Sequence, residues 1–180
     1  SDLFGWAMRP GATAGLIPTN DGQVCVFVGS HLDSVTVRDP DVYAAWLTQA
    51  SPALAAQVLA GRPEGRMRRF VGRAGRMLQP WGPGWVLVGD AGYWKDPISA
   101  HGITDALRDA ELAANAIAGA MGTDGVPEAA WMQDFHETRN RLSRDLFEVT
   151  DQIAAGTWTD ETIPLLLLQL SESMDDELAH

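Results

Sequence analysis

Two short apolar runs of strand length lie near the start of the chain, at residues 14–19 and 23–28. They flank Asn20-Asp21-Gly22, and an Asp-Gly pair supplies the positive φ that a tight turn requires. The second run is rich in β-branched and aromatic residues, which favour strands. The pattern therefore predicts a β-hairpin over residues 14–29.

Two helices are predicted after the hairpin, because each segment begins with a capping residue followed by proline. Asp39-Pro40 begins a helix that runs to about Gln49, and Ser51-Pro52 begins a second one that runs to about Ala60. The middle of the chain is expected to be extended. It contains possible strands at 66–71 and 75–79, a turn at 81–84 and a buried strand at 85–88.

Apolar positions in the second half recur at helical spacing, which predicts helices over 102–121, over 127–155 and from Asp160 onward. In the first, the steps between apolar residues alternate four and three, so six side chains share one face. They are Ile103, Leu107, Ala110, Ala114, Ile117 and Met121. The core or interface faces expected in the other two are Trp131, Phe135, Leu142, Leu146, Val149 and Ile153, and then Ile163, Leu166, Leu167, Leu170 and Met174.

Composition narrows the function classes. The 180 residues can bury a core, and their net charge of -11 argues against binding to nucleic acid or to an anionic membrane. Cys25 has no second cysteine to pair with, so a cytoplasmic location is expected. No apolar run has the length of a membrane span. The four histidines are scattered, and no metal site is predicted.

The densest chemical signal lies between the predicted strand at 85–88 and the predicted helix at 102–121. Gly89-Asp90 ends the strand, a loop containing Pro97 follows, and Gly102 opens the helix. This order places a carboxylate beside a helix N-terminus, whose free N–H groups and partial positive charge attract anions and electron-rich carbonyls. A ligand is expected between Asp90 and the amides near Gly102.

These residues resemble the second flavin-contacting motif of the FAD-dependent aromatic hydroxylases, the p-hydroxybenzoate hydroxylase-like monooxygenases. The resemblance covers about thirty residues: Gly89-Asp90 closes a strand, Pro97 follows seven residues after the Asp, Gly102 opens the helix, and Asp109 matches a recurring acidic position. Tyr93, Ser99 and Thr104 depart from the common His, Gly and Asn of that family.

The resemblance implies how FAD is held. The Asp90 carboxylate accepts a hydrogen bond from a ribityl hydroxyl, and the N–H groups of Gly102 and Ile103 face the pyrimidine edge of the flavin. Thr104 follows them in the motif, and Pro97 either shapes the loop or lies over the reacting face of the ring. No catalytic residue is identified: His101 stands at a variable position of the family.

The family's Gly-x-Gly-x-x-Gly turn for the ADP half of FAD is absent from these 180 residues. The chain is therefore interpreted as the C-terminal part of a flavoenzyme, with an α+β fold in three parts. Residues 1–80 are a remnant of the substrate-side sheet with two helices, 81–121 are the flavin-contacting strand-loop-helix, and 122–180 are helical. The implied reaction of the parent enzyme is hydroxylation of a small organic substrate with NAD(P)H as reductant, and the 180-residue chain alone is expected to be inactive. A halogenase or reductase is a less favoured interpretation.

A second hypothesis is a non-catalytic module that binds a partner, either a complementing N-terminal segment or another copy of itself. Exposed apolar surface on the Trp85 strand and the Ile103 helix is the mark expected of it.

Two other features keep alternatives open. Tyr93, Trp94 and Lys95 line a substrate pocket or form a buried aromatic pair with a solvated lysine. The six arginines between Arg62 and Arg76 form a solvated strand face or a docking patch for NAD(P)H phosphates.

Overall fold

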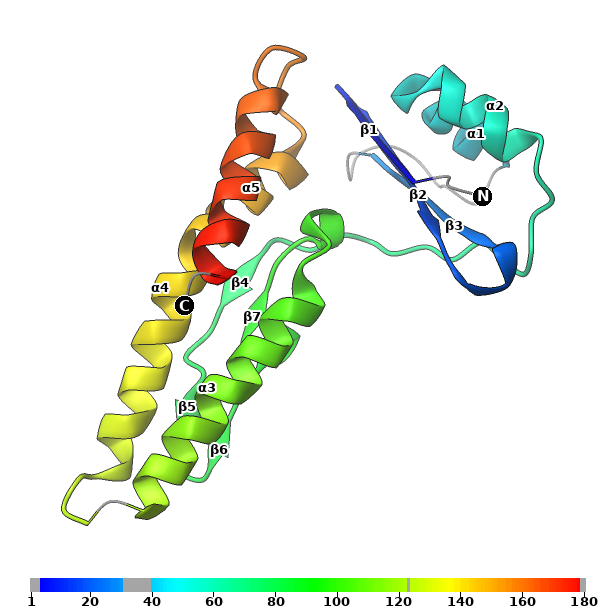
Figure 1. Ribbon diagram of the computed structural model, residues 1–180. Helices are drawn as coiled ribbons and strands as arrows, with labels where there is room; N and C mark the ends of the chain where they lie inside the picture. The colour runs from blue at the N-terminus through cyan, green and yellow to red at the C-terminus, as the bar shows by residue number, and fades with distance from the viewer. Residues whose placement is uncertain (1–3, 31–39, 123, 179–180) are drawn as a thin grey trace. The chain divides into compact units, whose positions relative to one another are not determined.

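The computed structural model of the chain describes residues 4–30, 40–122 and 124–178, without the side chains of 176–178 (Figure 1). The fold is of the predicted α+β class. Two compact units divide the chain: the first combines residues 1–72 with 155–164, and the second combines 73–154 with 165–180. The three-part division by function stays a prediction.

The first unit contains an antiparallel sheet of three strands in the order β1 (Gly5–Arg9), β2 (Ala12–Pro18) and β3 (Val24–Gly29). β2 and β3 form the predicted hairpin, in which Leu16 lies opposite Val26. The turn between them is the 3-10 segment η1 (Asn20–Gly22), where Asp21 has a φ of 58° and Gly22 a φ of 71°. Strand β1 was not predicted.

Helices α1 (Pro40–Ala50) and α2 (Pro52–Leu59) follow the sheet in the chain, and both predicted helices are confirmed. The Ser51 hydroxyl accepts a hydrogen bond from the backbone N–H of Leu54 at 3.3 Å, so Ser51 is the cap that the sequence predicts. The other predicted cap, Asp39, lies outside the described residues.

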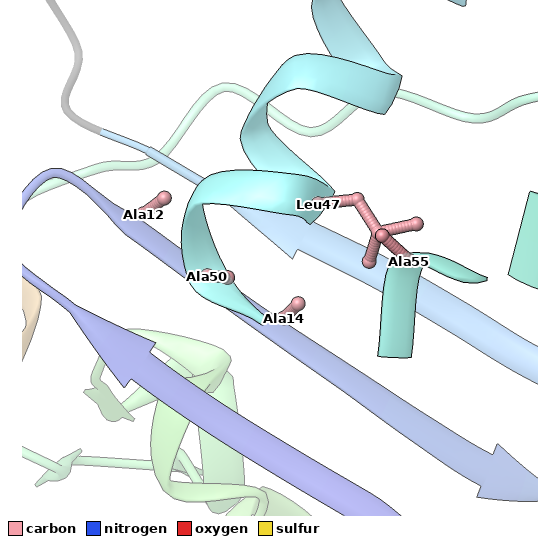
Figure 2. Close-up of a cluster of buried hydrophobic side chains, with 5 residues drawn as sticks. All are labelled: Ala12, Ala14, Leu47, Ala50 and Ala55. Carbon is pink, nitrogen blue, oxygen red and sulfur yellow. The ribbon is translucent and has the colours of Figure 1, made fainter. Parts of the chain in front are cut away.

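The core of the first unit is built mainly from small side chains. Its buried members are Ala12, Ala14, Leu47, Ala50 and Ala55 (Figure 2). The alanines of β2 let α1 lie close to the sheet, and the larger Leu47 fills the space between the helices and the sheet.

Residues 66–79, where the first unit ends at Gly72 and the second begins at Arg73, correct two predictions. No strand forms over residues 66–71; this stretch is exposed and irregular, and Met67 and Phe70 leave 54% and 60% of their surface open. With no strand there, the arginines in it have no alternating strand face. The run 75–79 contributes only the two-residue strand β4 (Arg76–Met77), which pairs with β7 (Tyr93–Trp94).

The predicted strand at 85–88 is also shorter than expected. Only β6 (Trp85–Val86) forms, and it pairs with β5 (Trp81–Gly82) across a turn at Pro83-Gly84. Trp85 is 48% exposed, so the expectation of a buried strand is wrong for this residue. Two 3-10 turns follow, η2 (Gly89–Ala91) and η3 (Pro97–Ser99).

Three helices complete the chain: α3 (Gly102–Gly122), α4 (Glu128–Ala155) and α5 (Ile163–Leu178). Ala113 and Ala116 of α3 pack against Met132 and Phe135 of α4 in a buried cluster. The predicted inner face of α4 is confirmed, because Phe135, Leu146, Val149 and Ile153 are buried and Trp131 and Leu142 are half-buried.

The last helix begins at Ile163 instead of near Asp160. Thr159 ends the preceding segment: its carbonyl accepts from the N–H of Ile163 at 3.0 Å, and its hydroxyl accepts from the N–H of Thr162 at 3.3 Å. Leu167, expected on the inner face, is 39% exposed, whereas Ile163 is buried. The remaining positions expected on that face, Leu166, Leu170 and Met174, are half-buried.

Helix α3 presents its six apolar residues to solvent. Ile103, Leu107 and Met121 are 81%, 69% and 85% exposed. The buried face of the same helix instead carries two carboxylates and two alanines, which are Asp105, Asp109, Ala113 and Ala116. The two carboxylates are inside because Lys95 pairs with Asp105 and Arg108 pairs with Asp109.

Candidate cofactor site at the start of α3

The five residues predicted to contact a cofactor lie on one stretch of the second unit, and all are exposed. Asp90 is in η2, Pro97 begins η3, and Gly102, Ile103 and Thr104 are the first three residues of α3. Their side chains and backbone are therefore open to a ligand. Their role in binding one stays a prediction.

The structure brings the Asp90 carboxylate to the first residue of α3. A Cβ added to Gly102 would lie 3.8 Å from Oδ1 of Asp90. The predicted juxtaposition of Asp90 and the helix N-terminus is thus confirmed. The first N–H groups of an α-helix have no acceptor within the helix, so donors and a carboxylate acceptor lie side by side at this point.

Glycine is required at position 89 for two reasons. Its φ is 53°, in the left-handed region that L side chains rarely adopt. A Cβ at this position would also lie 2.8 Å from the Cβ of Ala106, so the turn is in close contact with the second turn of α3. This close contact places Asp90 beside the helix.

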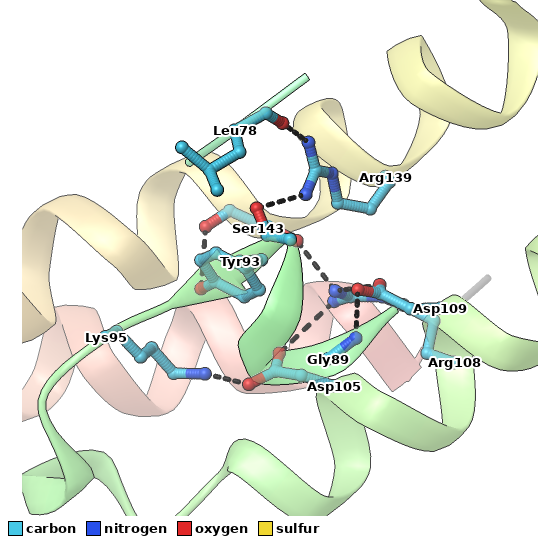
Figure 3. Close-up of polar contacts among 10 residues, drawn as sticks. Leu78, Gly89, Tyr93, Lys95, Asp105, Arg108, Asp109, Arg139 and Ser143 are labelled. Atoms are coloured by element: carbon cyan, nitrogen blue, oxygen red, sulfur yellow. Dashed lines mark hydrogen bonds and ion pairs between the residues drawn. The ribbon is translucent and has the colours of Figure 1, made fainter. Parts of the chain in front are cut away.

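A buried carboxylate of α3 holds the same turn. The backbone N–H of Gly89 donates to Oδ2 of Asp109 at 3.1 Å, and Nη2 of Arg108 donates to Oδ1 of Asp109 at 2.8 Å (Figure 3). Asp109 is fully buried. Arg108 also donates to the Ser143 hydroxyl of α4 at 2.7 Å, so one guanidinium links the turn, α3 and α4.

A second ion pair holds the segment that leads to η3. Lys95 forms a buried ion pair with Asp105, and its Nζ lies 4.6 Å from the centre of the Tyr93 ring (Figure 3). Arg108 approaches the other oxygen of Asp105 at 3.5 Å. The interpretation of Lys95 as a solvated loop lysine is wrong, because Lys95 is only 8% exposed. Burial of an ion pair of this kind needs close partners for both charges, and both have them.

Helix α4 contributes a buried arginine to the back of the site. Arg139 donates from Nη1 to the carbonyl of Gly92 at 3.0 Å and from Nη2 to the carbonyl of Leu78 at 2.8 Å. Burial lowers the pKa of the Arg139 guanidinium, and the nearby Asp109 carboxylate acts in the opposite direction. Tyr93 donates its hydroxyl to the Ser143 carbonyl at 3.2 Å.

The buried and half-buried polar residues form a scaffold, and the exposed ones form the surface that a ligand would meet. Asp96 belongs to the scaffold: its carboxylate accepts from the N–H of Ile98 at 2.9 Å and caps η3, the turn that carries Pro97. Burial raises the pKa of Asp96, whereas its hydrogen bond with Ile98 lowers it.

Sequence reasoning identified the exposed residues and missed most of the scaffold. Asp109 was singled out, but Asp105, Arg108, Arg139 and Ser143 were not. A signal was present: Asp105, Arg108 and Asp109 share one side of a helix whose opposite side is apolar. Charged residues opposite an apolar face are ordinarily interpreted as solvated, and here that interpretation fails.

Two kinds of feature, a metal-binding cluster and a membrane-spanning helix, are absent from the described part of the chain. No group of three or more His, Cys, Asp or Glu residues there is placed to hold a metal ion. None of the helices described has the length and apolar character that crossing a membrane requires.

Comparison of the chain with known protein families, with curated proteins and with solved structures finds no match.

Proposed function

We propose that the turn at Asp90 and the start of α3 hold the flavin of FAD, and that the chain is part of an NAD(P)H-using flavin monooxygenase that hydroxylates a small organic substrate. The observation that supports the site most strongly is the position of the Asp90 carboxylate beside the first residue of a 21-residue helix. The reaction class rests on the sequence resemblance.

The residues present fit this cofactor. Asp90 is an exposed acceptor for a ribityl hydroxyl, and Gly102 leaves its backbone open because it has no side chain. The N–H groups of Gly102 and Ile103 suit the pyrimidine edge of the ring, which gains negative charge when flavin is reduced. Bound flavin would supply the redox chemistry, and the chain would supply binding, orientation and electrostatic stabilisation.

The residues assembled here address the ring and the ribityl chain, which FAD and FMN share. We therefore expect the purified chain to bind FMN about as tightly as FAD. A titration of each flavin, followed by flavin fluorescence, tests this. Saturable binding of both supports a site formed by this chain, and a folded chain that binds neither contradicts it.

A partner-binding module is the second candidate function, and one observation favours it. The apolar side of α3 is exposed over the whole length of the helix, with Ile103 at one end and Met121 at the other. Apolar surface of this kind commonly marks an interaction site. The two candidates are separable, because flavin binding depends on Asp90 and association depends on the apolar side of α3.

A further inference from the structure

The exposed apolar residues of α3 follow the spacing of a coiled coil. They stand at positions 103, 107, 110, 114, 117 and 121, so the steps alternate four and three through nearly three heptads. This spacing produces a straight seam when two helices wind around each other with a left-handed twist. We call these six residues the α3 seam. The partner that fits such a seam is another helix.

The order of large and small residues in the seam indicates which helix is the partner. Two large residues, Ile103 and Leu107, are followed by Ala110 and Ala114 and then by two more large ones, Ile117 and Met121. The order is the same from either end. An antiparallel copy centred on position 112 therefore places large residues against large and small against small. Its layers are Ile103 with Met121, Leu107 with Ile117, and Ala110 with Ala114.

We propose that two copies of this chain associate through an antiparallel pair of α3 helices. A two-fold interface uses the same surface on both copies and must be complementary to itself, as the seam is. The alanines in the two central layers let the helix axes approach closely, and the large residues at both ends fill the wider parts.

The available surface is of the size that a dimer needs. A specific interface buries at least about 1,000 Å² in total, or about 500 Å² on each copy. Ile103, Leu107 and Met121 each leave more than two thirds of their surface exposed, and Ile117 leaves 42%. The flanking positions 104, 111 and 118 are exposed as well, so α3 alone offers an area of this order.

Charge opposes this association and so provides a diagnostic. Each copy carries a net charge of -11, and in the proposed register Glu111, one residue from the centre at 112, lies near the same residue of the other copy. Salt screens this repulsion while it leaves apolar contact intact. The dimer is therefore expected to tighten as sodium chloride rises, whereas association driven by opposite charges would weaken.

This inference does not rest on the flavin proposal. The seam shares Ile103, and the flanking Thr104, with the proposed cofactor site at the start of α3. Asp90 lies outside the seam, and the seam from Leu107 onward lies outside the cofactor site. Leu107 therefore has no role in the proposed cofactor contacts. Flavin binding and self-association can therefore each fail without the other, and the same purified variants report on both.

The first test is sedimentation equilibrium of the full chain and of two charge variants. Leu107→Glu places a charge in the seam, and Asn115→Glu places the same charge on the exposed polar side of the same helix. Neither side chain is in the core, so both variants should keep the wild-type circular-dichroism spectrum. We expect wild type and Asn115→Glu to be dimers and Leu107→Glu to dissociate at least tenfold more readily. A monomeric wild type, or equal weakening by both variants, overturns the proposal.

The second test determines orientation. In a Cys25→Ser background, Ile103→Cys and Met121→Cys are prepared as separate chains and treated with a short thiol-specific cross-linker. The antiparallel register predicts efficient cross-linking when the two chains are mixed and little within either one alone. Cross-linking of each variant with itself, and no cross-link that joins the two different variants in the mixture, would mean a parallel pair and would contradict the proposed register.

Discussion

The Asp109 carboxylate of α3 accepts a hydrogen bond from the backbone N–H of Gly89 at 3.1 Å, and both residues are buried. This bond attaches the turn that carries Asp90 to the helix whose N-terminus lies beside Asp90. The predicted cofactor site therefore depends on a residue behind it.

Removal of the Asp109 side chain should destabilise the fold and release the turn. Asp109→Ala leaves Arg108 without its closest carboxylate and leaves the Gly89 N–H without an acceptor, and loss of one member of a buried pair typically costs about 3–5 kcal/mol. Urea unfolding checks this. Asp134→Ala, on the exposed side of α4, serves as the control and should change the free energy of unfolding by about 0.5 kcal/mol or less. Equal effects of the two substitutions would contradict this role of Asp109.

Gly89→Ala should destabilise for two separable reasons, the positive φ and the contact with Ala106. A strained non-glycine conformation costs about 1–3 kcal/mol. The steric part is reduced when Ala106→Gly is added, because the nearest atom to the new methyl group is the Cβ of Ala106, although the Cα of residue 106 remains at 3.2 Å. The double variant should therefore be less destabilised than the sum of the two single ones. Strict additivity in urea unfolding would show that the contact does not matter.

The ion pair of Lys95 and Asp105 should appear as a coupling energy. Lys95→Met and Asp105→Leu each remove one charge of the buried pair. The double variant removes both charges, so a double-mutant cycle should give a coupling of about 1–3 kcal/mol. Arg108 also approaches Asp105, so part of the charge remains compensated when Lys95 is replaced. A coupling near zero would mean that the two charges are solvated.

Asp96 should make stability depend on pH in a direction opposite to that of most carboxylates. Burial raises its pKa in the folded chain, so its contribution is fully favourable below the pKa of the unfolded chain and is lost as pH rises through the folded pKa. Asp96→Asn keeps a side-chain cap for Ile98 and carries no charge. We expect it to be more stable than wild type at pH 7, with an advantage that disappears at low pH. Unfolding at pH 7 and pH 3 measures the difference, and a variant less stable at pH 7 would contradict it.

The hairpin, α1, α2 and the inner face of α4 could be predicted because local rules and burial agree in those segments. Asp-Gly forms the turn between β2 and β3, Ser51 caps α2, and Phe135 and Leu146 lie inside. The strand expected at 66–71 fails because strand formation needs a partner edge, and a short run of arginines and apolar residues carries no information about one.

The candidate site shows a different limit. Its exposed part, Asp90 and Gly102, follows from strand, loop and helix order. Its buried part does not, because Lys95 and Asp105 are stabilised inside by charges and rings brought to them by the fold. Such pairing leaves no periodic pattern in the sequence. Helix α3 shows the same limit: its apolar side faces outward and its buried side carries charges, the opposite of what periodicity ordinarily predicts.

A substitution at Gly102 distinguishes a structural role of this residue from a role in flavin binding. An added methyl group would make only ordinary contact with Asp90, and alanine is a better helix former than glycine, so Gly102→Ala should fold with unchanged or slightly higher stability. If a flavin ring approaches this backbone, the same methyl group should lower flavin affinity at least tenfold. Unchanged flavin affinity in this variant would place the ring elsewhere.

The most direct measurement of the central claim is a titration of FAD against the wild-type chain, Asp90→Asn and the control Asp134→Asn, followed by flavin fluorescence. Both aspartates are exposed, so neither substitution should alter the fold. The account predicts saturable binding to wild type and to the control, and binding at least tenfold weaker to Asp90→Asn. Equal binding to all three chains, or no binding to a folded wild type, would contradict it.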